Sequence, residues 1–547
     1  MQRTRQKIEW GFGRWAGLTY RHPRVTLVAC LLFVGTLASQ IVDVRIDLDA
    51  ESPVQVTPVL QIETSPEAFL HDDDPVLKVY DDFRKEFGRD DLMMLVVRAP
   101  DVLAPEFLEK LARLHHDLED EVPRLQDVQS LVNARETRSL ADELVVGELF
   151  DPWPEFAAEF RERRSRALAN PLYRDLLISS DARLTAVLIE TDVYSYDVYD
   201  DGDSAAHLGH QGGFDDEDFA ETPAGTAAEP RYLSGEENAE IVTAVKAVAA
   251  RYRAPDFEIY ITGAPSLIVE LATALVDDMR LFTGLAIGMI ALLLGLLFRR
   301  AAGVFLPLVI VVCSLLSTVG FMAAANFSVG IPTQILPSFL LAVGVADAVH
   351  VLSRFFQRLD GGDSREEAIV GALQHCGLAI LLTSLTTAGG LVAFAAAEIA
   401  PISDLGILAP LGTMIAFALS VTMLPAMVAL FPIRERRRDK PRGARLADWL
   451  VACGRFGIDH AGAVVATTAA ILVVALLGAL RINFGHDALG WFPEDNPYRM
   501  ASELVNDEMG GSMFVELLVD TGVENGLHEP ALLAKLEEAT QQASSLH

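Results

Sequence analysis

Seven long apolar runs constrain this chain of 547 residues more than any other feature of its sequence. A helix needs about 20 largely apolar residues to cross the hydrocarbon layer of a bilayer. Backbone groups in lipid must also be paired within the segment, and a helix pairs them. The sequence therefore predicts seven membrane-spanning helices. Their approximate bounds are 25–42, 281–298, 304–325, 333–352, 377–397, 405–431 and 463–480.

The first run is predicted to be a retained anchor, because no small-residue cleavage site follows it closely. Residues 1–24, which precede it, mix Lys and Arg residues with Trp10, Phe12, Trp15 and Tyr20. Aromatic and basic side chains of this kind favour the boundary between lipid and water. We expect a basic interfacial helix at 1–24, on the cytoplasmic side.

Lys and Arg residues in the short connections predict how the spans are oriented. The connections expected beside the N-terminus carry Arg299, Arg300 and the basic run 434–445, whereas 326–332 and 398–404 carry no Lys or Arg. The N-terminus is therefore predicted to be cytoplasmic and the chain to lie in the cell inner membrane. The domain boundaries that follow are a periplasmic domain at 43–280, a membrane core at 281–431, a cytoplasmic basic linker at 432–462, and a second external region at 481–547.

Most of the negative charge lies in the predicted periplasmic domain. Residues 43–280 hold 52 acidic and 22 basic residues, against a formal net charge of −32 for the whole chain. Binding the phosphate backbone depends on clustered Lys and Arg, so nucleic acid is excluded as a partner. The four cysteines lie in or beside apolar runs, and their spacing forms neither a disulfide framework nor a zinc motif. They are Cys30, Cys313, Cys376 and Cys453.

Short apolar patterns in this domain follow the order β-α-β-β-α-β, which is typical of a ferredoxin-like sandwich. A mostly helical insertion separates the two halves of the pattern. The predicted elements are a strand at 91–99, a helix at 105–118, strands at 128–132 and 183–191, a helix at 236–252 and a strand at 257–263.

The acidic segment 199–230 interrupts this order and is rich in Asp, Gly, Ala and Pro. Such a composition buries too little apolar surface to order itself, so a solvated flexible loop is expected. A divalent cation held by its carboxylates with His207 and His210 is the alternative. The segment has no Asp-x-Asp-x-Asp-Gly loop followed by a bidentate Glu, which disfavours a calcium site.

A long internal repeat follows the first and the seventh runs. The segment "FLHDDDPVLKVYDDFRKEFG" at 69–88 returns as "WFPEDNPYRMASELVNDEMG" at 491–510, with an offset of 422. With a three-residue shift, "PEFLEKL" at Pro105 also matches "PALLAKL" at Pro530. The seventh run therefore begins a second copy of the first half. We expect a truncated two-fold repeat from a longer protein, with a natural short form as the alternative.

An aspartate and a histidine interrupt the fourth run, in "LLAVGVADAVHVLSRF". An ionisable residue inside a span is costly and marks a functional site by default. Asp347 lies about eight residues, roughly 12 Å, from the predicted cytoplasmic end of its helix. Removal from water disfavours the charged carboxylate, so the group can bind and release a proton. His350 lies one turn nearer the cytoplasm and either passes the proton or has a structural role.

Four hydroxyl residues of the fifth run are expected at the same depth as Asp347. These hydroxyls would hydrogen-bond the carboxylate or hold a chain of water molecules. The alternative is that they bond to carbonyl groups of their own helix, as Ser and Thr often do in membrane helices. The residues are Thr383, Ser384, Thr386 and Thr387.

Six motifs, taken in order, resemble the resistance-nodulation-division (RND) superfamily of proton-driven exporters. The similarity is strongest to the branch named after mycobacterial large membrane proteins (MMPL), whose membrane core is shared with sterol-sensing-domain (SSD) proteins. The motifs are "FLHDDDP" with "WFPEDNP", "YITGAP" at 260–265, "GVADAVHVLSRF" at 344–355, "LTSLTTAGGLVAF" at 382–394 and "ISDLGILAPLG" at 402–412. Each motif is short, and their order and spacing carry the resemblance.

The resemblance implies that Asp347 takes up and releases the coupling proton. Many such exporters carry Gly-x-x-x-Asp-Tyr-x-x-His in this span. Here Gly344 precedes Asp347 by three residues and Ala348 stands at the tyrosine position. The departure keeps the aspartate and removes a hydroxyl that could tune it.

The sequence thus predicts a secondary transporter that moves a hydrophobic or lipid-like substrate outward at the expense of a proton gradient. The alternative is a membrane receptor or assembly factor that senses a sterol or another lipid without transporting it. Membrane lipids, the substrate and protons are the expected partners, and either a homo-oligomer or a missing second half completes the unit. No enzyme motif, cofactor site or metal site is predicted.

Overall fold

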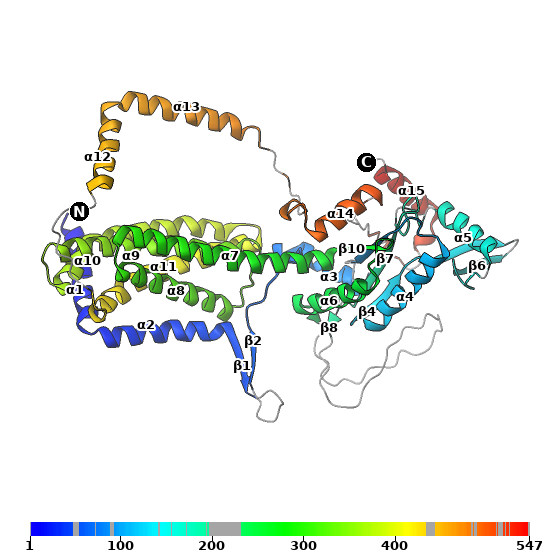
Figure 1. Cartoon of the computed structure of the whole chain (residues 1–547), viewed down its shortest axis with the longest axis horizontal. Helices are drawn as coiled ribbons and strands as arrows, with labels where there is room; N and C mark the ends of the chain where they lie inside the picture. Colours follow the sequence, from blue (N-terminus) through cyan, green and yellow to red (C-terminus); the bar gives the residue numbers. More distant parts are fainter. Residues whose placement is uncertain are drawn as a thin grey trace.

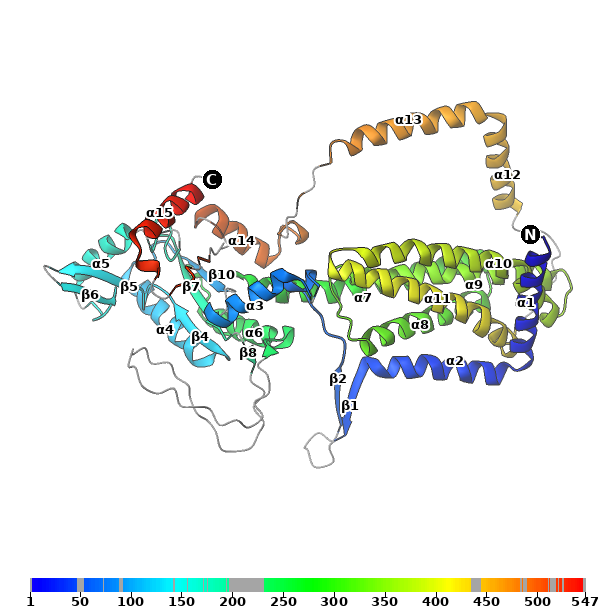
Figure 2. The same ribbon diagram turned by 180° about the vertical axis from the view of Figure 1, so that it is seen from behind.

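A computed structural model gives an elongated molecule with a helical bundle at one end and an α/β domain at the other (Figures 1 and 2). Helix α7 runs from one part to the other. The structure describes residues 2–46, 54–71, 73–87, 92–140, 143–154, 156–170, 172–174, 176–192, 194–195, 231–433, 444–482, 485, 489–509, 511, 518–519, 521–523 and 526–544. The acidic segment 199–230, with His207 and His210, lies outside these residues.

Among the described residues, seven helical segments are long and apolar enough to cross a membrane, so the predicted multi-pass α-helical membrane protein is confirmed. These segments are Pro23–Ile41, Ala264–Phe298, Ala301–Ala324, Thr333–Asp360, Arg365–Ala396, Ala400–Leu430 and Ala461–Ala479. The α-helices within them are α2 (Pro23–Ala38), α7 (Ala264–Phe298), α8 (Ala301–Ala324), α9 (Leu336–Asp360), α10 (Arg365–Val392), α11 (Ala400–Leu430) and α13 (Ala461–Ala479).

Two of these helices extend well beyond the predicted spans. α7 has 35 residues and begins at Ala264, so at 1.5 Å per residue it is about 52 Å long and continues into the α/β domain. α10 begins at Arg365, before the predicted start of the fifth span at 377, and continues into that span without a break. Ser364 and Glu367 form a capping box there, which satisfies backbone donors of the first turn.

Glycine allows close contact between the bundle helices α8, α9 and α11. A Cβ added at Gly344 of α9 would lie 3.1 Å from Cβ of Ala416 in α11. One added at Gly320 of α8 would collide with the backbone carbonyl of Leu37 in α2. The backbone of α9 therefore packs against a side chain of α11 at Gly344, and the backbone of α8 packs against that of α2 at Gly320, as small residues permit in membrane bundles.

Helix α1 (Gln2–Arg21) crosses the end of the bundle and packs against α10 and α11 (Figure 1). The chain turns between α1 and α2 at His22 and Pro23. In the same way, helix α12 (Ala444–Asp459) directly precedes α13, and the chain turns between them at His460. The predicted linker 432–462 therefore contains a helix. In both views α12 and α13 lie apart from the bundle, and none of the span in α13 is buried.

Four antiparallel strands form the central sheet of the α/β domain, in the order β10-β3-β7-β4. The element order along the chain is β3-α4-β4-β7-α6-β10, as the sequence predicts. The bounds are β3 (Met93–Arg98), α4 (Pro105–Glu121), β4 (Leu125–Gln129), β7 (Leu184–Thr191), α6 (Gly235–Tyr252) and β10 (Glu258–Gly263). Five consecutive residues of β3 are buried, so both faces of this strand are covered.

Strand β4 lies three residues earlier than the predicted strand at 128–132. The Asn133 side chain accepts a hydrogen bond from the backbone N–H of Ser130 and donates one to the carbonyl of Val128. This local pairing turns the chain directly after Gln129 and ends the strand. The cause is a side chain that competes with the sheet for backbone groups.

The insertion between the two halves of the sheet is not mostly helical, contrary to prediction. It contains an antiparallel hairpin of β5 and β6, followed by one helix, α5. Val145 and Val146 favour an extended backbone because their branched side chains restrict χ1. The remaining elements of the domain are β1 (Val42–Ile46), β2 (Val54–Pro58), α3 (Pro75–Phe87), β5 (Arg135–Leu140), β6 (Glu143–Glu148), α5 (Ala157–Ala169), β8 (Tyr194–Ser195) and β9 (Arg231–Tyr232).

Helix α14 (Pro497–Glu508), although it follows the seventh span, packs against β10 of the first sheet. Asn496 caps the helix by accepting hydrogen bonds from the backbone N–H groups of Tyr498 and Arg499. Val505 is fully buried in the core of the sheet.

Helices begin at equivalent prolines in the two copies of the repeat. In the first matched pair of segments, α3 begins at Pro75 and α14 at Pro497. In the second pair, α4 begins at Pro105 and α15 (Pro530–Ser544) begins at Pro530.

Candidate functional site

Asp347 lies inside the helical bundle, on α9, with 7% of its surface exposed. Among the residues whose burial the structure describes, it is the only Asp, Glu, Lys or Arg that is buried. A carboxylate removed from water needs a hydrogen-bond donor or a proton. The sequence places this acid in a span, and the structure turns it toward neighbouring helices.

Ser384 of α10 is the donor that the structure provides. Its hydroxyl oxygen lies 2.9 Å from Oδ2 of Asp347 and 2.8 Å from the carbonyl oxygen of Ile380, one turn earlier on its own helix. A hydroxyl has one hydrogen to donate and can accept hydrogen bonds as well. The single hydroxyl hydrogen of Ser384 can therefore be donated either to the carboxylate of Asp347 or to the backbone carbonyl of Ile380. Ser384 is 4% exposed.

Helix α11 packs against α9 at Gly344, which lies near Asp347 in the sequence of α9. Gly344, one turn before Asp347, contacts Ala416 of α11 through the close approach described above. Ser420 follows Ala416 by one turn on α11 and is fully buried, with no hydrogen-bond partner for its hydroxyl among the described residues. Sequence reasoning missed Ser420, because a serine in an apolar run gives no local signal of its environment.

Among the described hydrogen bonds, the other predicted site residues make none to the Asp347 carboxylate, although His350 acts on it electrostatically. His350 is exposed on the surface of α9, and its backbone carbonyl accepts a weak bond from Cys376 Sγ at 3.9 Å. The Thr383 hydroxyl donates to the carbonyl of Ile380, and the Thr386 hydroxyl donates to carbonyls of its own helix. Thr387 is half-buried. Of the four predicted hydroxyls, Ser384 is the one that the fold brings to the acid.

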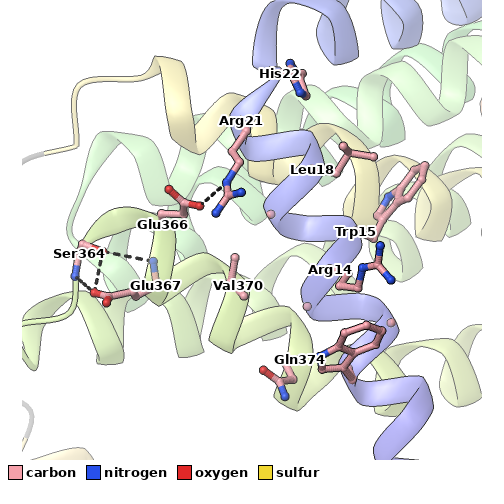
Figure 3. A pocket seen from close by; sticks show the side chains of 14 residues that line it. Arg14, Trp15, Leu18, Arg21, His22, Ser364, Glu366, Glu367, Val370 and Gln374 are labelled. Atoms are coloured by element: carbon pink, nitrogen blue, oxygen red, sulfur yellow. Dashed lines mark hydrogen bonds and ion pairs between the residues drawn. The ribbon is translucent and has the colours of Figure 1, made fainter.

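A polar groove lies between α1 and the start of α10 (Figure 3). The guanidinium of Arg21 pairs with Glu366 at 2.8 Å, and that of Arg14 stacks over the Trp10 ring at 4.8 Å. Trp10 itself is 57% exposed. The basic and aromatic side chains predicted for an interfacial helix thus line an open surface at the end of the bundle.

An apolar groove lies on the other side of α1, between α2 and α11. Trp15 separates the two grooves and donates a long hydrogen bond of 3.4 Å from its indole to the Thr422 hydroxyl. The residues lining the apolar groove are Trp15, Leu18, Thr19, Val25, Thr26, Ala29, Cys30, Phe33, Met414, Ile415, Ala418, Leu419 and Thr422.

Fold and site together define a multi-pass helical membrane protein with a buried carboxylate in its bundle and an α/β domain between its first two spans. Residues 227–456 match the model of the MMPL family. This segment includes β10 and the five spans α7 to α11. The resemblance to the MMPL branch of the RND superfamily, predicted from the motifs, is therefore confirmed.

Several mycobacterial proteins are similar to the chain over part of their length. The probable transport protein MmpL9 of Mycobacterium tuberculosis is 28% identical over 248 residues, 44% of this chain and 25% of the relative. The siderophore exporter MmpL5 of the same species is 24% identical, over 47% of this chain and 27% of the relative. The mycolic acid-containing lipids exporter MmpL11 of Mycolicibacterium smegmatis is 24% identical, over 52% and 31%. The matches thus cover less than a third of each of these relatives.

Proposed function

We propose that this protein works as an MMPL-type exporter of a hydrophobic or lipid-like substrate, driven by protons that bind and leave Asp347. The observation that carries the proposal is the burial of this carboxyl group beside Ser384 in the bundle. Ionisable residues within spans are rare, face bundle interiors and mark ion pathways. His350 and the remaining hydroxyls of α10 belong to the same proposal as candidates for the path to water.

Ser384 suits both protonation states of Asp347. When the acid is ionised, the Ser384 hydroxyl donates to Oδ2. When the acid is protonated, its O–H donates to Ser384, and the Ser384 hydroxyl donates to the carbonyl of Ile380 instead. The two distances of 2.9 and 2.8 Å allow either arrangement without movement of the helices. The site therefore avoids an unsatisfied buried group in either state.

The names of the relatives support the class of substrate. MmpL5 is named for siderophores and MmpL11 for mycolic acid-containing lipids. The apolar groove beside α1 supports the same class, because its lining offers a surface on which an acyl chain can pack.

Orientation and domain organisation are further parts of the proposal. The N-terminus and the basic residues at the α1 end would lie in the cytoplasm, within the inner membrane, by the distribution of Lys and Arg. The α/β domain would lie outside, as a ferredoxin-like unit. Its antiparallel strand order, with a helix after β3 and another before β10, supports this interpretation. The paired start of α3 and α14 supports a two-fold repeat.

Reconstituted vesicles test the proton coupling. The purified protein would be placed in vesicles that enclose a pH-sensitive dye, and proton flux would be recorded on addition of a long-chain fluorescent phospholipid as probe. We expect Asp347→Asn to abolish lipid-dependent proton flux, because an amide neither binds nor releases the proton. Thr468→Ala in α13 is the matched control, since this hydroxyl lies outside the proposed proton path and donates to the Val464 carbonyl of its own helix.

The same vesicles separate the transporter from a lipid-sensing receptor. Equal flux in wild type and Asp347→Asn would refute the coupling. Binding of the phospholipid by both forms, with no flux in either, would instead favour the receptor.

A further inference from the structure

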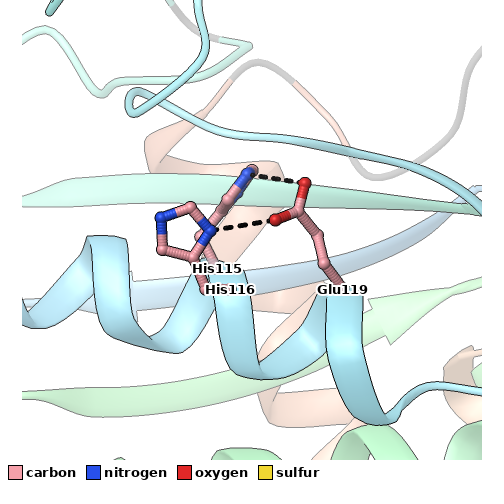
Figure 4. A group of neighbouring side chains, drawn as sticks. All are labelled: His115, His116 and Glu119. Atoms are coloured by element: carbon pink, nitrogen blue, oxygen red, sulfur yellow. Dashed lines mark hydrogen bonds and ion pairs between the residues drawn. The ribbon is translucent and has the colours of Figure 1, made fainter. Parts of the chain in front are cut away.

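Two histidines and a glutamate converge on α4 of the α/β domain (Figure 4). Nε2 of His115 lies 3.3 Å from Oε1 of Glu119, and Nδ1 of His116 lies 3.0 Å from Oε2 of the same carboxylate. The candidate ligand atoms of the three residues all lie within 4.8 Å of one another. The spacing i, i+1 and i+4 brings the three side chains together because Glu119 lies one turn after the histidines.

A buried contact fixes the orientation of the His115 ring. His115 is 2% exposed, and its Nδ1 lies 3.1 Å from the Ser130 hydroxyl in the turn after β4. This hydroxyl also accepts a hydrogen bond from the backbone N–H of Val132. Because a hydroxyl both donates and accepts, Ser130 serves either tautomer of the ring. Nε2, the other nitrogen, faces Glu119 and is left to bind a proton or a metal.

We propose that His115, His116 and Glu119 bind a zinc ion on the surface of the α/β domain. Imidazole nitrogens and carboxylate oxygens are ordinary zinc ligands, at about 2.0–2.2 Å. Adjacent ligand atoms around a tetrahedral zinc ion then lie roughly 3.3 Å apart. Each histidine nitrogen lies at about this distance from one oxygen of Glu119, at 3.3 Å from Oε1 for His115 and at 3.0 Å from Oε2 for His116, so a rotation of the carboxylate would bring one oxygen to the ion. The ion would replace the protons that the two rings now share with the carboxylate, and water would supply the fourth ligand.

The surroundings of the cluster favour a cation. Burial lowers the pKa of His115, which keeps the ring neutral as metal binding requires, while the charges of Glu119 and of Asp127 on β4 act on it in the opposite direction. The side chains of His116 and Glu119 are 67% and 43% exposed, so an ion can enter from solvent without opening the fold. The His115 ring is held in a fixed orientation by its burial and by the hydrogen bond to its Nδ1. Metal-binding histidines usually have such a hydrogen bond to the nitrogen that does not bind the metal.

Such a site is separate from Asp347 and lies outside the membrane-spanning segments. Its ligands come from one helix, and Ser130 connects that helix to the turn after β4. Zinc binding to the folded domain would therefore stabilise it by a free energy that rises with the logarithm of the free zinc concentration above the dissociation constant.

Zinc titration of the purified full chain, followed by calorimetry after treatment with a chelator, tests the proposal. Zinc alone is the probe. His116→Ala and Glu119→Gln are the informative variants, because both side chains are exposed and their loss spares the core. His207→Ala with His210→Ala is the control, since the acidic segment is the competing source of histidines.

We expect wild type and the control to bind one zinc ion with the same affinity, and both cluster variants to bind it at least about tenfold more weakly. Cobalt in place of zinc should give the visible absorption of a tetrahedral site in wild type and the control only. Unchanged zinc affinity in both cluster variants overturns the proposal, as does loss of binding in the control or no binding by wild type. Equal thermal unfolding of all metal-free forms verifies that the variants fold.

Discussion

The hydroxyl oxygens of Thr262 and Ser502 lie 2.7 Å apart in a buried contact between segments 240 residues distant in the chain. Thr262 is in β10, just before α7 begins, and Ser502 is in α14, which follows the seventh span. The phenol of Tyr498 reaches the same two hydroxyls. A polar contact thus ties the segment after the seventh span to the strand that leads into the second span.

Removing one member of this hydroxyl pair should destabilise the α/β domain. Ser502→Ala leaves the buried Thr262 hydroxyl with fewer partners, so we expect a loss of about 1 kcal/mol in the free energy of unfolding. Denaturant unfolding followed by tryptophan fluorescence measures it. In a double-mutant cycle, Thr262→Val should cost less on the Ser502→Ala background than alone. Strict additivity of the two changes would contradict a direct contact.

Val505 and Val79 provide a comparison between the two repeat helices. Val505 of α14 is fully buried in the core of the sheet, whereas Val79 of α3 is 65% exposed. Val505→Ala should lower the free energy of unfolding by about 2 kcal/mol, because two buried methyl groups are lost and a cavity remains. Val79→Ala should change it by less than about 0.5 kcal/mol. Similar effects in the same unfolding experiment would show that α14 does not pack on this sheet.

Asp127 and Glu190 are directly opposite each other on β4 and β7. Burial first, and then the Asp127 charge, raise the pKa of Glu190 above its ordinary value of 4.5. The folded state therefore holds this proton more tightly than the unfolded state, so its stability falls as pH rises from 4.5 through the raised pKa. We expect Glu190→Gln to stabilise the domain at pH 7 by a few tenths to about 1 kcal/mol. Urea unfolding at pH 7 and pH 4 measures this, and an equal gain at both values would refute the explanation.

Gly344 should tolerate no large side chain, because α9 and α11 touch there. A Cβ at this position already lies 3.1 Å from Ala416 and 3.4 Å from Val311, so Gly344→Val should push the helices apart. Gly389→Val in α10 is the control, since a Cβ there meets nothing within 4 Å. Thermal unfolding in detergent should show a lower midpoint for the first variant and little change for the second. Equal midpoints would contradict the close contact.

Ser384→Ala should damage the site more than Thr383→Ala does. The first change removes the donor to the buried Asp347 carboxyl, at a cost of about 1–3 kcal/mol when the acid is ionised. The second removes a hydroxyl that donates to the Ile380 carbonyl. We expect a larger loss of proton flux and a lower unfolding midpoint for Ser384→Ala than for Thr383→Ala. Equal effects of the two changes on flux would show that the Asp347 contact has no special role.

The sequence was sufficient for the seven spans and for the order along the chain of the four strands of the central sheet and the helices α4 and α6. The hydropathy of a run of about 20 residues and the alternation of apolar and polar residues over five to eight are local properties of the sequence. They can therefore be recognised without knowledge of the fold. The prediction failed where a side chain overrode the local pattern, as Asn133 does after β4. It also failed for β5 and β6, since two strands are stable only through their pairing with each other.

For the candidate site, the sequence by itself determined that an acid, Asp347, lies within an apolar run beside a hydroxyl-rich one. Only the tertiary structure decided which hydroxyl serves it, by turning Ser384 toward the acid and leaving Thr386 on its own helix. The apolar face of α14 can be recognised from its own residues. That this face packs on β10, a strand 240 residues earlier in the chain, was decided by the tertiary structure. Periodicity defines the face that a helix buries. Which element covers that face depends on helix rotation and packing, and these are set by contacts between distant parts of the chain.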